Sequence, residues 1–438
     1  MMHKTIKLSC FALLLPGMLY AQNVKKLTIQ EAIQLGIDNS KNLKLSQNKI
    51  DESLAKIEVV KDEALPTATA SVLYNHLEFA GNHTLSFGTD NLALPRRLDA
   101  YLGTVSVSET IYGGGKQRLA RQNTKLLSEV AHLDAEKVRE EAIYATIDTY
   151  YSLYKLSQSH KVVEQNLTSI DSQLKQATRF FEQGIVTKND VLRFQLQLAN
   201  VNLTKVDLEG NAKIINYNLD ILLGLPEDTQ IEISDPDSQN LPVAPLSNYL
   251  DQGMSTRQEL RELDLQNKMA EIDIKNVKAN MRPTFGVGAS GYYVSTVVNP
   301  FPGGNDYLAP VSLMANLSWN IGTLWTNKHK LSDSRIQQKQ IDIQKTIQSD
   351  QVRTEINKNY QNYVVAKNKI TILETSIEQA SENDRLFASK YKNNVASATD
   401  RIDAETLLLQ AQIDLEIAKA DAGLAYYTLL KSTGKISQ

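Results

Sequence analysis

The segment that decides the fold is Val311-Ser312-Leu313-Met314-Ala315-Asn316-Leu317-Ser318-Trp319-Asn320. Every odd-numbered position in this segment is apolar, whereas the even-numbered positions are mostly Ser and Asn. This period of two predicts a β-strand with one apolar and one polar face, because successive side chains of a strand point to opposite sides. Membrane-spanning strands show this alternation over about 9–11 residues. A soluble hairpin that buries one face has the same period, so alternation alone leaves both interpretations open.

Three further runs alternate in the same way. Ala68, Ala70, Val72 and Tyr74 alternate with Thr69, Ser71 and Asn75, and residues 101–111 and 285–293 show the same period. Tyr112 and Trp319 stand at the ends of runs, where aromatic side chains are typical of the membrane–water interface. These aromatic ends favour strands that span a membrane.

Four strands cannot close a barrel on their own. The smallest membrane barrels have about eight strands, and an open edge in lipid would leave backbone groups without hydrogen bonds. The membrane interpretation therefore requires oligomers. Two chains would supply eight strands and a filled interior, and three chains would supply twelve strands and a wider lumen.

The chain contains two copies of one unit. A shift of 217 residues takes Pro66-Thr67 to Pro283-Thr284, and a shift of 210 takes Gly224 to Gly434. Each copy consists of a helix, a strand pair, a long helix and a return helix. We expect the first repeat at residues 22–225 with strands within 67–112, a Pro- and Asp-rich connector at 226–245, and the second repeat at 246–438 with strands within 284–321.

The helices are expected to be unusually long. In the first copy we expect them at residues 28–65, at 116–182, and from a cap at Asn189 or Asp190 to Leu223; in the second copy, at 247–282, 327–392 and 399–431. A helix of about 65 residues is ~100 Å long, and its apolar residues repeat every seven, as in a coiled coil. An ordinary long coiled coil remains open from the helices alone.

Asp384 breaks the apolar stripe of the second long helix, where the first copy has Leu174. We expect it to lie at an interface edge that reaches solvent. The alternatives are a polar residue that specifies the coiled coil and a residue that lines a tunnel.

The first 21 residues have the pattern of an export signal, with a basic start and a short apolar run. Cys10 lies inside this signal, so a processed chain would have no thiol chemistry. The net charge of −3 gives no reason to expect nucleic acid. Residues 286–291 match G-x-G-x-x-G but continue a strand instead of opening a helix, and the six histidines lack metal-ligand spacing. We therefore expect no enzyme, cofactor or metal site.

At this point the chain resembles the TolC family of outer-membrane efflux proteins. Leu65-Pro66 ends a helix before a strand, and Tyr112-Gly113-Gly114-Gly115-Lys116 has the form of a strand-to-helix turn. Phe181-x-x-Gly184-x-x-Thr187-x-x-Asp190 is similar to the tip of the family's helical hairpin. The resemblance covers nearly all of the sequence after the signal. It is specific because the features occur in the same order in both copies; in the second copy, for example, Pro283 ends the helix before the strand.

The resemblance implies a mainly α fold with a small β part. Long α-helices would form a coiled-coil barrel through the periplasm, and a transmembrane β-barrel would be completed by trimerisation, with four strands per protomer and twelve in total. It also implies a homotrimer in outer-membrane lipid whose tips meet a periplasmic adaptor, the membrane fusion protein, attached to an inner-membrane pump. The tip residues expected to contact the adaptor are Gly184, Thr187, Asp190, Asn394 and Ser397.

The second tip carries the candidate periplasmic gate. Asp400 and Asp403 match two aspartates that ring the narrow entrance in family members, and such a ring favours cations. Capping of the following helix is the alternative role of Asp400. The tip departs from the family because Asn394 replaces a glycine and Ala396 a basic residue, while Arg401 stands beside Asp400.

The function implied is an outer-membrane exit duct of a tripartite efflux system. The alternatives are the outer-membrane component of a type I protein-secretion system and a soluble periplasmic coiled-coil adaptor or scaffold. Adaptors also have long helical hairpins, but their β-rich parts lie outside the hairpin, whereas the alternating runs here lie between helices.

Overall fold

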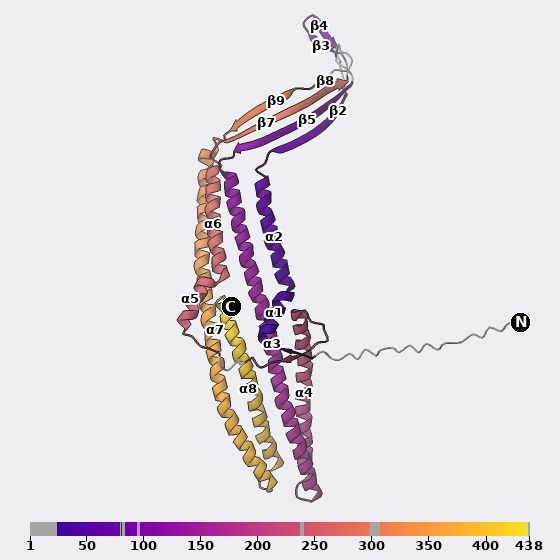
Figure 1. Ribbon diagram of the computed structural model, residues 1–438, viewed down its shortest axis with the longest axis vertical. Coiled ribbons are helices and arrows are strands. Elements are labelled where there is room, and N and C mark those ends of the chain that lie inside the picture. Colours follow the sequence, from indigo (N-terminus) through magenta and orange to yellow (C-terminus); the bar gives the residue numbers. More distant parts are fainter. Residues whose placement is uncertain are drawn as a thin grey trace, which may run out of the picture. The chain divides into compact units, whose positions relative to one another are not determined.

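The computed structural model describes residues 24–78, 80, 84–93, 97–236, 241–297 and 307–436 (Figure 1). The expected export signal with Cys10 lies outside these residues, as do residues 298–306 of the segment 284–321 that is expected to hold the second strand pair. The segment 67–112, expected to hold the first strand pair, also contains a short hairpin of β3 (Thr84–Phe87) and β4 (Asp90–Ala93).

The described residues are mainly helical, as expected. The first copy contains α1 (Ile29–Asn39), α2 (Lys41–Asp62), α3 (Lys116–Glu182) and α4 (Lys188–Leu223), and the second contains α5 (Leu246–Thr256), α6 (Gln258–Ala279), α7 (Thr323–Lys392) and α8 (Ala398–Ser432). The bounds of α3 are those expected from the sequence. Among the described residues, none of the helices combines the length and the apolar character that crossing a membrane requires.

The first helix of each copy is broken, which was not expected. The breaks fall at Ser40 and Arg257, 217 positions apart, and both residues have extended backbone with ψ of 112° and 124°. One turn earlier, Gly36 and Gly253 face the long helix so closely that an added Cβ would lie 2.4 Å from Thr146 Oγ1 and 2.3 Å from the Ile356 Cδ1 methyl, respectively. The duplication therefore preserves a three-dimensional contact as well as a sequence pattern.

The central sheet has the strand order β2 (Thr67–Glu78), β5 (Arg97–Tyr112), β7 (Thr284–Val297), with β9 (Val311–Ser318) and the short β8 (Tyr307–Leu308) both pairing with β7. All neighbours are antiparallel. Both expected strand pairs are therefore present. A small parallel pair of β1 (Val24–Leu27) and β6 (Gln230–Ile233) was not expected, and β6 lies in the segment interpreted as an irregular connector.

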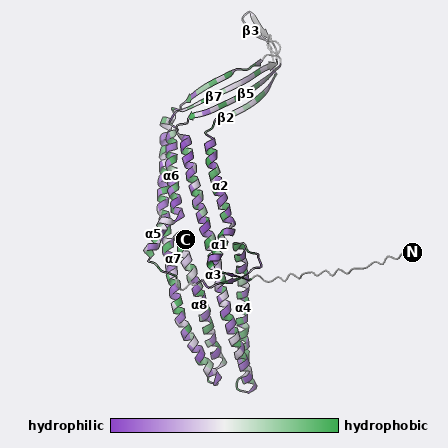
Figure 2. Ribbon diagram, in the orientation of Figure 1, coloured by the Kyte–Doolittle hydropathy of each residue, from purple (hydrophilic) through white to green (hydrophobic). Residues whose placement is uncertain are grey.

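Two compact units contain these elements. The first comprises residues up to Ser40, Ala142–Val243 and Asn359–Leu429, and the second comprises Lys41–Glu141, Ala244–Lys358 and the residues after Leu429. In the first unit, apolar layers between helices include Val163, Ile170, Val201 and Leu409. The second unit contains the central sheet, along whose strands apolar and polar residues alternate (Figure 2).

Candidate functional site

The central sheet has one apolar and one polar face that continue across all four long strands. Antiparallel partners share a face, so the pairing defines rows of side chains. One row on the apolar face is Ala70, Val105, Gly291 and Val311; the next is Ala68, Val107, Ala289 and Leu313. The matching polar row is Thr69, Ser106, Ser290 and Ser312, in which the Thr69 and Ser106 hydroxyl oxygens are 2.7 Å apart.

The apolar face is open to its surroundings. Val72 is 82% exposed, Val311 80% and Leu313 84%. A β-bulge between Thr110 and Tyr112 then shifts the register, so that Tyr112 pairs with Phe285 on this face. Apolar exposure on this scale, along every strand, marks a face that is covered by something other than the described part of the chain.

Aromatic residues stand at both ends of the apolar face. Tyr112 and Phe285 lie at the end next to the helices. At the other end the rings of Tyr74 and Tyr101 have centroids 5.1 Å apart, and Tyr293 faces Gly103 in the neighbouring strand. The sheet thus carries two aromatic belts with mainly aliphatic residues and glycines between them, and with Glu109 next to the belt of Tyr112 and Phe285.

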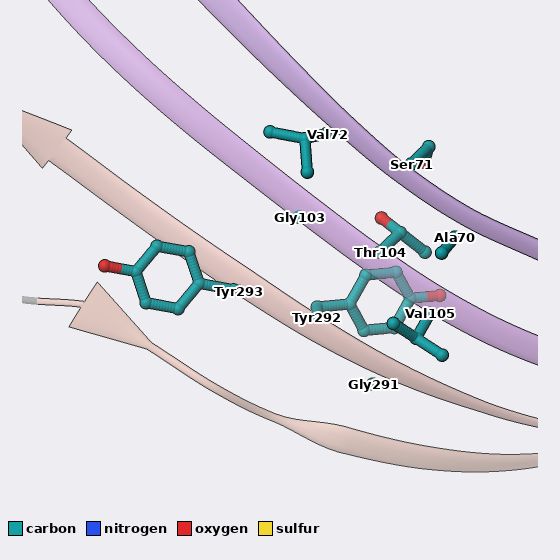
Figure 3. A pocket seen from close by; sticks show the side chains of 9 residues that line it. All are labelled: Ala70, Ser71, Val72, Gly103, Thr104, Val105, Gly291, Tyr292 and Tyr293. Carbon is teal, nitrogen blue, oxygen red and sulfur yellow. The ribbon is translucent and has the colours of Figure 1, made fainter.

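The apolar face is hollowed where side chains are smallest. A shallow depression of about 370 Å³ lies over three neighbouring strand segments, with Gly103 and Gly291 among its lining and Val72 and Tyr293 beside them (Figure 3). The G-x-G-x-x-G segment belongs to β7, as expected. A Cβ at Gly288 would lie 3.0 Å from the Val107 carbonyl oxygen, so close strand packing accounts for that glycine.

The expected strand-to-helix turn lies at Gly113, Gly114 and Gly115. Gly114 and Gly115 have φ of +70° and +90°, and a Cβ on Gly114 would lie 2.9 Å from the carbonyl oxygen of Ala279. Arg282 donates from Nη1 to the Gly114 carbonyl at 3.1 Å. The turn therefore needs glycine both for its backbone conformation and for its close approach to α6.

The two helix tips are built alike, 210 residues apart. Gly184 at φ +75° and Asn394 at φ +55° end α3 and α7 in the left-handed conformation. At each tip the next N–H donates five residues back, from Ile185 to the Phe180 carbonyl and from Val395 to the Lys390 carbonyl, both at 2.8 Å. This is a Schellman motif, and it shows that Asn394 takes the conformation that the family's glycine would take.

Each return helix begins with a capping box. Thr187 caps α4, and its N–H donates to Asp190 Oδ2 at 2.8 Å; the cap thus lies two or three residues before the expected Asn189 or Asp190. In the second copy Ser397 donates its N–H to Asp400 Oδ2 at 3.0 Å, and Asp400 donates its N–H to Ser397 Oγ at 3.2 Å. Asp400 therefore serves the helix start as the third residue of a capping box.

Capping leaves Asp400 with its negative charge. The backbone and side-chain hydrogen bonds from Ser397 hold the pKa of the Asp400 carboxyl below its usual range. Asp400 and Asp403 are both exposed, one turn apart at the start of α8. The tip thus presents two carboxylates to solvent.

Arg401 does not neutralise these carboxylates, because its side chain is buried and forms an ion pair with Asp384. Beside this pair, Glu405 is 4% exposed and accepts a hydrogen bond from Gln173 Nε2 at 2.7 Å. Burial raises the pKa of Glu405. The Asp384 side chain is 20% exposed, so it partly reaches solvent as expected, but its carboxylate belongs to a largely buried polar layer, defined here as Asp384, Arg401, Glu405 and Gln173.

Sequence reasoning missed this layer, although the duplication carried a signal for it. The first copy has Leu174, Val191 and Gln195 where the second has Asp384, Arg401 and Glu405. Charges that occur in one copy only, at positions that are apolar or neutral in the other, indicate a polar contact between elements.

Among the described residues, one group has the composition of a metal site: His160, Glu164 and Glu209. The His160 Nε2 atom lies 3.3 Å from Glu209 Oε1, and the Lys205 ammonium pairs with both glutamates. The lysine supplies the positive charge that a metal would bring, so these residues form an ion-pair cluster.

Comparison with known proteins agrees with this architecture. The family model described as outer membrane efflux protein matches residues 32–225. The outer membrane efflux protein BepC of Brucella suis is 20% identical over 76% of this chain and 73% of its own length. Nodulation protein T of Rhizobium leguminosarum is 22% identical over 91% of this chain and 83% of its own.

Solved structures share the fold of this chain over both copies of the repeat. The outer membrane protein VceC of Vibrio cholerae superposes with a TM-score of 0.72 over 93% of this chain and 96% of its own, at 14% identity. The family match over the first repeat, the relatives that span most of the chain and the shared fold together show that this chain is similar to outer membrane efflux proteins and has the TolC-like fold of their channels.

Proposed function

We propose that the protein is the outer-membrane exit duct of a tripartite efflux system, carrying substrates from an inner-membrane pump and a periplasmic adaptor to the outside. The observation that carries the proposal is the register of the central sheet, which in the rows from Ala68 to Val72 keeps apolar residues and glycines on one face and mostly hydroxyl-bearing residues on the other. Lipid would cover the apolar face and water the polar face.

The spacing of the aromatic belts supports this placement. Tyr101 and Tyr112 are eleven residues apart on β5, which is roughly 36 Å along a strand at about 3.3 Å per residue. With the tilt of about 35–45° that strands adopt in membrane barrels, this corresponds to ~25–30 Å along the membrane normal, close to the apolar height of such barrels.

A homotrimer would complete the duct. Among the described strands, β2 pairs only with β5 and β9 only with β7, so each leaves one edge for another copy. The return helix α4 also leaves an apolar stripe open, with Leu196, Leu203 and Val206 each more than 60% exposed. These residues are spaced seven and three apart, as in a coiled-coil seam, and α7 of a second copy is the partner that the duplication suggests. Three copies would give twelve strands.

The two tips would contact the adaptor. Each presents one exposed β-branched residue directly after its left-handed residue: Ile185 is 45% exposed and Val395 74%. Ile185 and Val395 lie next to the residues that are expected to contact the adaptor. These are Gly184, Thr187 and Asp190 at the first tip and Asn394 and Ser397 at the second. An adaptor that offers an apolar seat with a polar rim would fit both tips.

Asp400 and Asp403 remain the candidates for the periplasmic gate. In a trimer they would place six carboxylates around one entrance, and the burial of Arg401 against Asp384 leaves them without a basic neighbour at the adjacent position. Such a ring would attract cations and resist anions.

Fractionation and reconstitution test the proposal. We expect the protein in the outer membrane as a trimer, and we expect the purified trimer to conduct ions across a planar bilayer with a preference for cations. Recovery as a soluble periplasmic monomer, or a trimer that never conducts, would refute it.

A further inference from the structure

The polar face of the central sheet is interrupted near the end remote from the helices by an apolar row that crosses four strands, and the pair Leu77 and Leu98 follows further out on the same face. Leu73 on β2 pairs with Leu102 on β5, Leu102 pairs with Val294 on β7, and Val294 pairs with Leu308 on β8. Each of these strands therefore places an aliphatic side chain at the same register position. We name these four residues the distal apolar row.

The row contrasts with its neighbours on the same face. The next row toward the helices is Ser71, Thr104 and Tyr292, and the row after that carries only hydroxyl side chains. Leu73 is 53% exposed, Leu102 37% and Leu308 70%. Exposed aliphatic residues on a face that water should fill are unfavourable unless something apolar covers them.

The described strand residues bring no charge to this face. Glu78, Arg97, Asp99 and Glu109 all share the opposite face with Tyr74 and Val107. Apart from Met314, a molecule on the polar face therefore meets mainly hydroxyl and amide groups before it reaches the aliphatic side chains of the remote end. There the row of Asn75, Ala100 and Thr296 separates the distal apolar row from Leu77 and Leu98. A polar surface followed by an apolar one can contact both parts of an amphiphilic molecule. Because the described residues of this face carry no charge, the contact does not depend on the sign of the molecule's charge.

We propose that the distal apolar row is a contact strip for the apolar part of organic, amphiphilic cargo as it leaves the duct. The inference rests on the proposed function, which makes this face the lumen. Because strands tilt in a barrel, the rows of three copies would form three oblique segments around the exit instead of a level ring. The distal apolar row would bind organic cargo weakly and would not affect the passage of small hydrated ions.

Block of single-channel current tests the inference. Tetrabutylammonium and tetramethylammonium carry the same charge but differ in apolar surface, and each is added to the compartment that the strand end of the duct faces. We expect tetrabutylammonium to block at much lower concentration than tetramethylammonium. In the variant Leu73→Ser/Leu102→Ser its half-blocking concentration should rise roughly tenfold, as the loss of ~60 Å² of apolar contact at ~25 cal/mol per Å² predicts.

The control variant is Asn316→Ser, which changes a side chain on the same face next to the helices and should leave the block unchanged. Equal half-blocking concentrations for tetrabutylammonium and tetramethylammonium would overturn the inference while the duct function stood. So would a tetrabutylammonium block that Leu73→Ser/Leu102→Ser leaves unchanged. If the wild-type trimer does not conduct, the proposed function itself fails. A block that is lost equally in Asn316→Ser would also count against the row as the contact site.

Discussion

Replacing Arg401 with alanine should destabilise the protein far more than removing a comparable surface arginine. Arg401 has a side chain that is 7% exposed and pairs with Asp384, which is 20% exposed. Its removal would leave Asp384 without its counter-charge in a buried setting and would take positive charge away from the nearby Glu405. Breaking a buried ion pair in this way typically costs about 3–5 kcal/mol.

The matched control is Arg385→Ala. Arg385 pairs with Glu382 through two hydrogen bonds of 2.7 Å, but both side chains are more than half exposed. Exposed pairs contribute little to stability, so this variant should behave like the wild type.

A third variant separates the net contribution of the charges from the cost of leaving one unpaired. Asp384→Leu/Arg401→Val/Glu405→Gln installs the residues that the first copy has at the equivalent positions, namely Leu174, Val191 and Gln195. Replacing a whole buried ionic group with apolar or neutral residues is often neutral or stabilising. We expect the triple variant to be at least as stable as the wild type.

Thermal unfolding of the purified protein in detergent, followed by the helical circular-dichroism signal at one scan rate, ranks the variants. We expect Arg401→Ala to unfold on the order of 10 °C below the wild type, as about 2–4 °C per kcal/mol implies for a unit of this size. Equal midpoints for Arg401→Ala and Arg385→Ala would show that the polar layer is not buried as described. A triple variant weaker than Arg401→Ala would refute the cost assigned to the unpaired charge.

Three further perturbations test other parts of the structure. Asn394→Ala should destabilise the second tip by about 1 kcal/mol and Asn394→Gly should not, because the residue sits at φ +55°; equal thermal midpoints would contradict this. Asp220 is fully buried, and burial raises the pKa of its carboxyl to about 6 from an ordinary value near 4, so its stabilising contribution should be complete below about pH 4 and lost as pH rises through 6. Asp220→Asn should then reduce the difference between thermal midpoints at pH 5 and pH 8, and an unchanged difference would argue against this assignment. Asp400→Asn/Asp403→Asn keeps an acceptor oxygen for the capping box and should raise conductance and lower cation preference, measured as reversal potential in a KCl gradient. The equivalent change in the first tip, Asp190→Asn, should have no such effect, and similar shifts from both would speak against a gate on the second copy.

The sequence predicted the elements well because their signals are local and repeated. The alternation in residues 311–318 and the glycines at 113–115 specify strands and turns through the residues themselves, and the duplication doubled each observation. The bounds of α3 follow from Gly115 before it and Gly184 after it, which leave no helical alternative.

What the sequence did not predict depends on contacts between distant segments. The pairing of β1 with β6 joins four-residue strands that lie about 200 residues apart, too short to show a period. The breaks at Ser40 and Arg257 have no proline or glycine at the break itself, and each lies one turn after a glycine, Gly36 or Gly253, that closely approaches a neighbouring helix. The partner of Asp384 was likewise hidden, because Arg401 stands beside Asp400 in sequence but faces the hairpin interior.

The central claim is that the two faces of the sheet meet lipid and water. Spin labels introduced one at a time on β9, at Ser312, Leu313, Ala315 and Asn316, test it directly in reconstituted membranes. The account predicts that labels at Leu313 and Ala315 collide with dissolved oxygen and not with a water-soluble nickel chelate, whereas labels at Ser312 and Asn316 collide with the chelate. Labels at Leu313 and Ala315 that are reached by the chelate, or by neither reagent because protein covers them, would contradict it.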